Sequence, residues 1–290
     1  MIRTVPASAA GEGIKSMFVS AGGHETHYLS AGSTGRPLIL VHGGGAGADA
    51  EGNWSNVIPR LAGRYDIYAP DMVGFGRSAK PRDDGYEYSQ PERELHLTAF
   101  LDALKLGPAI LVGNSMGGLT CLGIARDRPD LVSHLVLMGS AGIAMPLSPQ
   151  LKTILHYDFT LQGMERIVRA LTAPNFRIPP GMVEYRYSIT ATEDAKHAYK
   201  KITAWMNARG GLQIPEERIA GVDKPTLVVA GKNDLVVPIT SAYKFLELIP
   251  QSWGMILPDC GHWPMIEHPE VFAEIVDQFV CRLSAGARAA

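Results

Sequence analysis

The feature that most constrains this chain is a serine in a glycine-rich turn between a predicted strand and a predicted helix. Residues 113–118 read Gly-Asn-Ser-Met-Gly-Gly, after the apolar run 109–112 and before the helix-like stretch 119–125. So sharp a turn strains the backbone of Ser115, and the flanking glycines give it room. The turn holds the hydroxyl clear of the sheet, at a helix N-terminus whose free N–H groups can stabilise an oxyanion. A chance Gly-x-Ser-x-Gly match is the alternative, and the strand-before, helix-after context argues against it.

Length and composition limit what this turn can belong to. A chain of 290 residues with 46% hydrophobic residues can bury a large core, and α/β architectures of this size are often one core with an insertion. A formal net charge of −2, without a basic run interleaved with aromatics, argues against a nucleic-acid partner. We therefore expect small-molecule chemistry.

The cysteines and the apolar stretches indicate where the protein works. Cys121, Cys260 and Cys281 are odd in number and widely spaced, as expected of reduced thiols in a cytoplasmic protein. The start of the chain lacks the apolar region of a signal peptide, and no long uncharged apolar stretch suits a membrane span. We expect a cytoplasmic location and no membrane partner.

Short apolar runs alternate with helix-length segments along most of the chain. The segments 15–19 and 26–29 flank Gly22-Gly23 and predict a hairpin. The later runs are typical of strands buried on both faces of a parallel sheet. These predicted strands are 37–41, 65–68, 109–112, 135–137, 225–230 and 254–257, and the last helix is expected over 269–279.

The interval 142–221 breaks this rhythm. It contains helical patterns at 164–171 and 182–189, separated by prolines. We interpret it as a helical cap inserted between two parts of a core domain, 1–141 and 222–290. A second independent domain is the alternative, and so short a segment has little core of its own.

A serine hydroxyl is a poor nucleophile at neutral pH, so Ser115 needs a base and the base needs an orienting carboxylate. Asp234 follows the predicted strand 225–230, and His262 follows the strand 254–257. Taken alone, His262 would be a structural histidine and Asp234 a turn residue. In the order serine, acid, histidine, with all three at carboxyl ends of strands, they predict a catalytic triad.

Residues 42–48, His-Gly-Gly-Gly-Ala-Gly-Ala, follow the strand that ends at Val41. Their spacing also satisfies G-x-G-x-x-A with Asp71 after the next strand, so a dinucleotide site is an alternative. Residues 49–53 argue against it, because they place acidic, loop-like residues where a pyrophosphate would lie. Interpreted as an oxyanion loop, the segment brings the N–H of Gly44 opposite that of Met116.

At this point the whole chain resembles the α/β-hydrolases, and specifically the meta-cleavage product hydrolases, the carbon–carbon bond hydrolases of bacterial aromatic degradation. The resemblance rests on residues 113–118, on the loop 42–45 followed by Trp-Ser-Asn at 54–56, and on Cys-Gly-His-Trp at 260–263. Asn114 and Trp263, beside the nucleophile and the base, are not generic features of esterases. The resemblance implies a mostly parallel eight-stranded sheet flanked by helices, with an inserted helical cap.

The resemblance also implies a substrate. Segments 156–160, 170–172 and 185–187 are similar to the branch that acts on biaryl-derived products such as those of carbazole breakdown. The expected substrate is a 2-hydroxy-6-oxo-6-arylhexa-2,4-dienoate, which is ketonised and then attacked by the serine. The products are 2-hydroxypenta-2,4-dienoate and an aromatic carboxylate. The resemblance implies no metal or organic cofactor. It does imply a homo-oligomer, a dimer or higher.

The family positions that grip the dienoate end match Gly45, Asn56, Asn114, Arg186 and Trp263 in this sequence. A guanidinium can hold a carboxylate bidentately, which agrees with that role for Arg186. On residue type alone, Arg186 would be an exposed arginine paired with Glu184 or Asp194. Likewise Trp263 would be a core-filling aromatic, and Asn114 would bond the local backbone of the turn.

Two other functions use the same motifs. A carboxylesterase or lactonase needs the triad and the oxyanion loop but no carboxylate clamp. A ligand-binding receptor built on the hydrolase fold would keep the triad and turn over negligibly. Bleaching of a yellow dienoate, turnover of esters alone, and binding without turnover distinguish the three.

Overall fold

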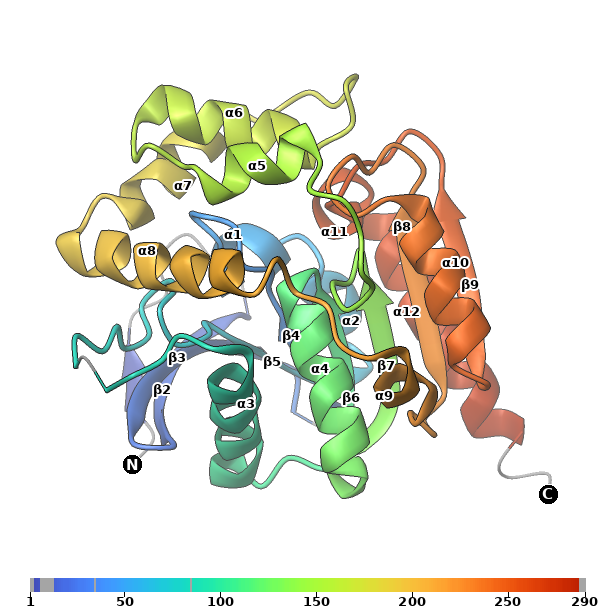
Figure 1. The fold of residues 1–290 in the computed structure, drawn as a ribbon. Helices are drawn as coiled ribbons and strands as arrows, with labels where there is room; N and C mark the ends of the chain where they lie inside the picture. The colour runs from blue at the N-terminus through green and yellow to red at the C-terminus, as the bar shows by residue number, and fades with distance from the viewer. Residues whose placement is uncertain (1–2, 6–12, 34, 84, 287–290) are drawn as a thin grey trace.

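A mostly parallel sheet forms the centre of the computed structural model, which describes residues 3–5, 13–33, 35–83 and 85–286 (Figure 1). Its nine described strands follow the order β1-β2-β3-β5-β4-β6-β7-β8-β9. Pairs are parallel from β5 to β9 along this order and antiparallel from β1 to β5. The predicted architecture is present, with one strand more than expected because the short β1 extends the edge of β2. The strands are β1 (Arg3–Val5), β2 (Lys15–Ala21), β3 (His24–Ala31), β4 (Arg36–Val41), β5 (Tyr65–Pro70), β6 (Ala109–Asn114), β7 (Val132–Met138), β8 (Thr226–Gly231) and β9 (Ser252–Leu257).

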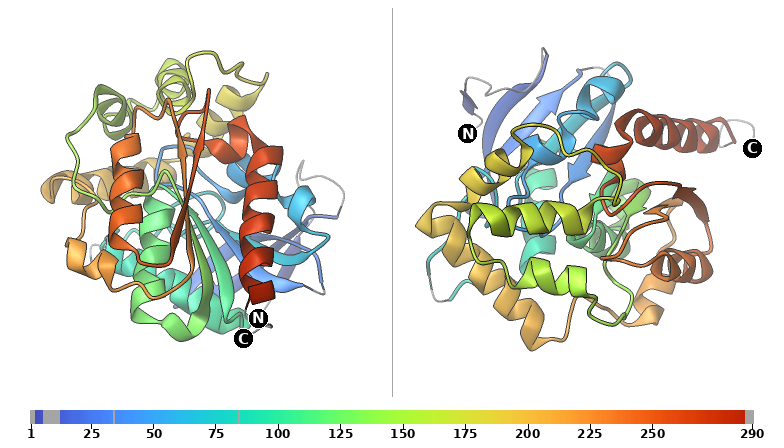
Figure 2. Two further views of the ribbon diagram at one scale, coloured as in Figure 1. Left: turned by 90° about the vertical axis from the view of Figure 1, so that its right-hand side faces the viewer. Right: turned by 90° about the horizontal axis from the view of Figure 1, so that it is seen from above.

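Helices cover both faces of the sheet, which explains the continuous apolar runs. Strands β6 and β8 are buried along their whole length, as strands covered on both faces must be. Figure 2 shows α4 and α10 on one side of the strands and α12 on the other. The helices that flank the sheet are α1 (Ala50–Trp54), α2 (Ile58–Leu61), α3 (Gln90–Leu104), α4 (Met116–Asp127), α9 (Glu216–Ala220), α10 (Ile239–Leu248), α11 (Pro264–Glu267) and α12 (Pro269–Gly286), with the 3₁₀ helix η1 (Pro129–Leu131) before β7.

Residues 149–208, between β7 and β8, lie over the carboxyl ends of the strands, in the upper part of Figure 1, whereas α9, which follows them, packs beside the sheet against α4 and α10. Two of the helices in residues 149–208, α6 (Leu161–Leu171) and α7 (Met182–Thr190), contain the predicted helical patterns. The other two, α5 (Pro149–Leu155) and α8 (Glu193–Ala208), were not predicted. All four are therefore in position to cover the side chains at the carboxyl ends of the strands.

The predicted hairpin is present, since β2 and β3 pair on either side of Gly22 and Gly23, which both have positive φ.

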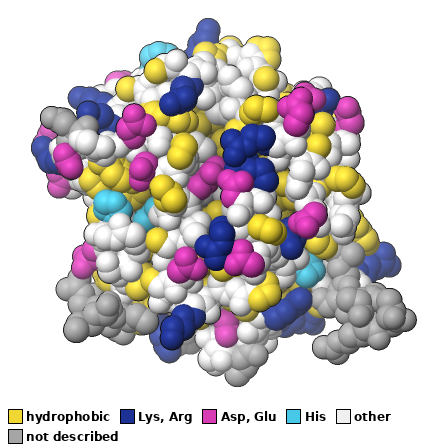
Figure 3. All heavy atoms as spheres, turned by 60° about the horizontal axis from the view of Figure 1, so that its bottom comes forward, with side chains coloured by type: hydrophobic (Ala, Val, Ile, Leu, Met, Phe, Trp, Pro, Cys, Tyr) yellow, Lys and Arg dark blue, Asp and Glu magenta, His cyan; other side chains and the backbone are white. Residues whose placement is uncertain are grey.

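None of the described helices combines the length and the apolar character needed to cross a membrane. The three cysteines are free, and Cys281 alone among them is exposed. On the face shown in Figure 3, acidic and basic side chains are interspersed. Residues 1–2 and 6–12, part of the segment on which the signal-peptide prediction rested, lie outside the described residues.

Candidate active site

Ser115 occupies the sharp turn between β6 and α4. Its backbone has φ 56° and ψ −120°, a conformation that side chains other than glycine rarely adopt. The flanking glycines are required by close approach: a Cβ at Gly117 would lie 2.4 Å from the carbonyl oxygen of His42, and one at Gly113 would lie 2.5 Å from that of Gly117. Among the described residues the Ser115 hydroxyl has no hydrogen-bond partner, which leaves it free to engage a base when substrate is bound.

Asp234 and His262 form a buried pair beside this serine. The Nδ1–H of His262 donates to Oδ2 of Asp234 over 2.7 Å, and the two side chains are almost inaccessible. The other carboxylate oxygen accepts the backbone N–H groups of Val236 and Val237 at 2.8 and 2.9 Å. With its Nδ1 proton held in this way, His262 presents a lone pair at Nε2. The structure thus brings the serine, acid and histidine predicted from sequence to one place.

Gly139, at the end of β7, belongs to the same constellation and was not predicted. A Cβ added there would lie 3.0 Å from Nδ1 of His262 and 3.3 Å from Oδ2 of Asp234. Its φ of 50° also favours glycine. Nothing in the sequence marks Gly139 among the many glycines of the chain, because the contact is made with residues far along the sequence.

The loop after β4 faces the serine. Gly44 and Met116 both line the cavity at Ser115, and Met116 is the first residue of α4, so its N–H has no partner within the helix. The Met72 N–H donates to Nε2 of His42 at 3.0 Å, so the ring carries its proton on Nδ1 and donates it to the Gly43 carbonyl at 2.7 Å. Burial lowers the pKa of His42, which keeps the ring neutral in this role.

The residues after this loop form a helix, which corrects one expectation. Residues 49–53 were interpreted as loop-like, but α1 begins at Ala50 and Asp49 caps it by accepting the Gly52 N–H at 2.7 Å. Asp49 and Glu51 are buried there, where a pyrophosphate would meet negative charge. In a dinucleotide site Asp71 would bind the ribose, but it is also buried and already fully hydrogen-bonded. Its carboxylate accepts from the His27 ring and from the N–H groups of Ala50 and Arg77.

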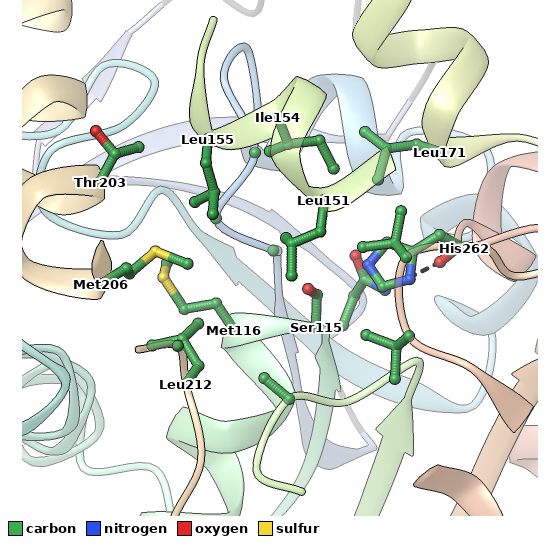
Figure 4. Close-up of a pocket in the computed structure, with 18 of the residues that line it drawn as sticks. Ser115, Met116, Leu151, Ile154, Leu155, Leu171, Thr203, Met206, Leu212 and His262 are labelled. Carbon is green, nitrogen blue, oxygen red and sulfur yellow. Dashed lines mark hydrogen bonds between the residues drawn. The ribbon is translucent and has the colours of Figure 1, made fainter. Parts of the chain in front are cut away.

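A cavity lies between the strand ends and the helices above them. In Figure 4 the Ser115 hydroxyl points into it, between Met116 and His262. Its walls are mostly apolar and come largely from α5, α6, α8 and the segments next to them. The apolar lining residues include Ile143, Met145, Leu147, Leu151, Ile154, Leu155, Leu171, Met206, Leu212, Val236 and Val237.

Besides Ser115 and His262, five of the predicted site residues line the cavity: Gly44, Gly45, Asn114, Met116 and Trp263. Asn114 is fully buried, and its Nδ2 donates to the carbonyl oxygens of Met138 and His262, at 3.1 and 3.3 Å. These partners are distant in sequence, so Asn114 does more than bond the local turn. Its Oδ1 is buried and has no hydrogen-bond partner among the described residues.

Arg186 is buried rather than exposed. Its side chain belongs to α7, is 1% accessible, and lies with its Cζ 4.3 Å from the ring centroid of Trp263. The alternative of an exposed arginine paired with Glu184 or Asp194 is therefore wrong, and Asp194 pairs with Arg82 instead. Trp263 forms part of the cavity wall, whereas Arg186 is not among the residues that line it.

The guanidinium of Arg186 holds the segment around α1. One terminal nitrogen donates to the Gly47 carbonyl at 3.0 Å, the other donates to the Gly52 carbonyl at 2.9 Å, and both reach Oδ1 of Asn53 at 3.2 Å. Burial lowers the pKa of Arg186 to about 10, so it remains a cation at neutral pH. Its Nε is buried and has no partner among the residues that the structure describes.

Asn53 lines the cavity, where we expected Asn56 from the sequence. Asn56 is exposed and does not line the cavity, whereas Asn53 is 2% accessible and does. The two donors of Arg186 require an oxygen on their side of the Asn53 amide, which turns its Nδ2 away from Arg186. That Nδ2 is buried and has no partner in the part of the chain that the structure describes. Helical spacing from Asp49, the cap of α1, was the available signal for Asn53.

These residues offer a nucleophile, a base, a buried amide donor, and two backbone N–H groups without a partner among the described residues, all from positions that line one cavity. Among the described residues, no cluster of three or more His, Cys, Asp or Glu side chains could hold a metal ion. The arrangement suits attack by a serine on a carbonyl carbon.

Similarity to known proteins extends along nearly the whole chain. A family model described as alpha/beta hydrolase fold matches residues 36–269. The 2-hydroxy-6-oxo-6-(2'-aminophenyl)hexa-2,4-dienoic acid hydrolase of Metapseudomonas resinovorans is 50% identical, over 94% of this chain and 93% of that protein. The 2-hydroxymuconate semialdehyde hydrolase of Pseudomonas sp. (strain CF600) is 32% identical, over 93% and 95%. The crystal structure of a serine hydrolase involved in carbazole degradation, the CarC enzyme, matches with a TM-score of 0.85 and 49% identity, over 92% and 98%.

Proposed function

The chain belongs to the α/β-hydrolase family and, within it, to the meta-cleavage product hydrolases, and from this premise we propose that it cleaves the C5–C6 bond of a 2-hydroxy-6-oxo-6-arylhexa-2,4-dienoate. Water is consumed, and the products are 2-hydroxypenta-2,4-dienoate and an aromatic carboxylate. The relative from Metapseudomonas resinovorans, whose name specifies an aminophenyl substrate, supports the aryl form.

One observation carries this proposal: a single cavity joins Ser115 to a polar end at Asn53 and to a long apolar wall. The substrate has a carboxylate at one end, an aryl group at the other and the reacting ketone between them. An ester with two apolar halves would have no partner for the buried amide donor of Asn53.

At the polar end, Asn53 Nδ2 would donate to the dienoate carboxylate while Arg186, behind it, supplies positive charge. The free Oδ1 of Asn114 is suited to accept the 2-hydroxy proton of the dienol. Trp263 and Gly45 would bound the flat dienoate on its faces. Held in this way, the C6 ketone is brought to Ser115.

The chemistry then proceeds in three steps. The dienol is ketonised, losing its 2-hydroxy proton and gaining one at C5. Ser115 Oγ attacks C6 as its proton passes to Nε2 of His262, and the N–H groups of Gly44 and Met116 receive the negative charge at the C6 oxygen. The C5–C6 electron pair leaves with C5 as a stabilised dienolate, which takes up a proton, and water activated by His262 releases the aryl carboxylate from the serine.

We include in the proposal that residues 142–221 act as a cap that shapes the aryl end. Helices α5, α6 and α8, together with the segments next to them, contribute most of the apolar lining. Methionines at 145 and 206 add flexible thioether side chains, which adapt to aromatic rings. The aryl preference would therefore be set by this segment, while the triad stays with the two flanking parts of the chain, 1–141 and 222–290.

The direct test is a panel of yellow ring-cleavage products that differ in the 6-substituent. We expect bleaching of the dienoate chromophore, with higher kcat/KM for aryl than for hydrogen or methyl substituents. Turnover of neutral esters without bleaching would identify a carboxylesterase or lactonase instead. Tight binding without turnover of either would identify a receptor.

Asn53→Asp is expected to separate dienoate recognition from general hydrolysis. The carboxylate keeps an acceptor for Arg186 but replaces the unpartnered Nδ2 donor with a negative oxygen. Repulsion of the substrate carboxylate and loss of its charge-assisted hydrogen bond should lower kcat/KM for the dienoate on the order of 100-fold. A neutral aryl ester has no carboxylate to repel, so its hydrolysis should stay near the parent rate.

Asn56→Asp is the matched control, since it makes the same chemical change three residues later at an exposed position. It should alter neither activity. Equal losses for dienoate and ester in Asn53→Asp, or a loss confined to Asn56→Asp, would contradict the proposed polar end. Arg186→Ala is a less informative probe, because it leaves the acceptors at Gly47, Gly52 and Asn53 buried without their donor.

We also propose a homo-oligomer in the cytoplasm. β9 is the last strand in the described sheet, and its Trp253 and Met255 are 42% and 39% exposed, a combination typical of a strand edge covered by another copy. The free cysteines support a reducing compartment. Light scattering of the purified protein tests the assembly, and a monomeric mass at micromolar concentration would refute it.

A further inference from the structure

The loop that carries His262 is fixed by its backbone N–H groups. The N–H of His262 donates to the Leu171 carbonyl at 2.9 Å, at the end of α6. On either side, the N–H groups of Gly261 and Trp263 donate to Oε1 of Glu267 at 3.0 and 3.3 Å. Each residue of the stretch 261–263 therefore has its N–H bonded to α6 or to one carboxylate.

The second oxygen of that carboxylate reaches the segment above the sheet. Oε2 of Glu267 accepts the N–H of Ala173 at 2.8 Å, two residues after the end of α6. Backbone packing between the two segments is tight, since a Cβ at Gly261 would lie 2.7 Å from the Ala173 nitrogen. Glu267 is thus a bridge between the loop of His262 and the chain that leaves α6.

The contacts of the His262 ring do not by themselves fix its position relative to Ser115. Asp234 holds Nδ1, and the ring can pivot about that bond unless its backbone is anchored. The anchors are the N–H of His262, its carbonyl bonded by Asn114 at 3.3 Å, and the neighbouring N–H groups bonded to Glu267. Of these, Glu267 is the one side chain that also contacts the segment after α6.

We propose that Glu267 is a positioning residue, which fixes the base His262 over Ser115 by tying its loop to the chain at the end of α6. This inference rests on the proposed triad but on no particular substrate. It makes the placement of the base depend on the placement of the segment above the sheet. A shift of α6 would move Ala173 and Leu171, and the loop of His262 with them.

Glu267→Gln tests the bridge. A glutamine offers one acceptor oxygen, so it cannot accept from both Ala173 and the loop, and its NH₂ group would face a backbone N–H. We expect kcat to fall about 10- to 100-fold, the range for a small misplacement of a reacting group. KM should change less than about threefold, because Glu267 bonds only backbone N–H groups and the side chains of Asn53, Asn114 and Arg186 at the polar end keep their partners.

The decisive readout is the rate at which a phosphonofluoridate modifies Ser115. The serine oxygen bonds to phosphorus, fluoride leaves and the serine proton passes to His262, so this rate reports on the base without any dienoate. It should fall in Glu267→Gln by a factor similar to that in kcat. If the dienoate panel fails while this rate still falls, the substrate assignment is wrong and the positioning role stands.

Glu94→Gln is the matched control, because Glu94 is another partly buried glutamate, bonded to Gln90 on α3 away from the cavity. It should react at the parent rate. Equal rates for the parent and a folded Glu267→Gln would overturn the proposal. An equal loss in Glu94→Gln would also overturn it, by showing a general loss of packing.

Ala173→Pro provides a second test, which leaves Glu267 in place. It can replace the first test if Glu267→Gln does not fold. It removes the N–H that Glu267 accepts as a hydrogen bond from the α6 side and puts a ring carbon of the proline in its place. Thr172 before it already has the extended ψ of 159° that a following proline favours. Phosphonylation should slow several-fold, in the same direction as in Glu267→Gln. An unchanged rate in folded Ala173→Pro would refute the link to α6.

Discussion

Ser115→Ala is expected to lower kcat on the order of a million-fold while leaving the fold intact, as removal of a triad nucleophile does. The strained turn that presents this hydroxyl is held by the close approach of Gly117 to the His42 carbonyl, which the substitution does not touch. The Ser115 hydroxyl has no hydrogen-bond partner among the described residues, so its removal breaks no structural bond. Loss of dienoate bleaching with an unchanged circular dichroism spectrum is the expected measurement.

The chain contains its own control for this prediction. Ser16 Oγ lies 2.8 Å from Nε2 of His27, whose Nδ1 lies 2.8 Å from Oδ2 of Asp71, so a second serine, histidine and aspartate are joined in a triad-like series. All three are 1% accessible and line none of the described cavities near Ser115. Ser16→Ala should therefore leave kcat within a few-fold of the parent. Near-normal turnover by Ser115→Ala would end the proposed mechanism.

The fold and the triad could be predicted because their signals are local. Strand β6, for example, is buried on both faces, so its residues 109–112 are all apolar and the run is visible in the sequence. The Ser115 turn and the positions of Asp234 and His262 after strands follow from the same runs. Helix α8 was missed because its buried stripe consists largely of alanine, tyrosine and threonine among charged residues.

The partners of the site residues could not be predicted, because most of them are backbone groups. Arg186 is bonded to the carbonyls of Gly47 and Gly52, and a carbonyl carries no mark of residue type. The carboxylate of Glu267 likewise accepts hydrogen bonds from backbone N–H groups, which carry no mark of residue type either. Asn53 lies within α1 whereas Asn56 lies beyond its end, and the boundaries of so short a helix are poorly defined by sequence.

Asp234→Asn is expected to lower kcat about ten-thousand-fold, because it changes which nitrogen of His262 carries the proton. Oδ1 of Asp234 accepts the N–H groups of Val236 and Val237, and an asparagine must keep its oxygen there. Its NH₂ group then replaces Oδ2 and donates to Nδ1 of His262, which becomes an acceptor. The ring proton moves to Nε2, and the nitrogen that should take the proton of Ser115 no longer can.

Asp259→Asn is the matched control for this change, since it makes the same substitution at an exposed carboxylate three residues before His262. Its backbone has φ 47°, which asparagine adopts readily, so the fold should tolerate it. Steady-state bleaching and the rate of phosphonylation of Ser115 should both fall in Asp234→Asn and neither in Asp259→Asn. A silent Asp234→Asn would mean that another group orients His262. Because the N–H groups of Val236 and Val237 fix the orientation of the amide, that result would also require this turn to rearrange, which a crystal structure of the variant would reveal.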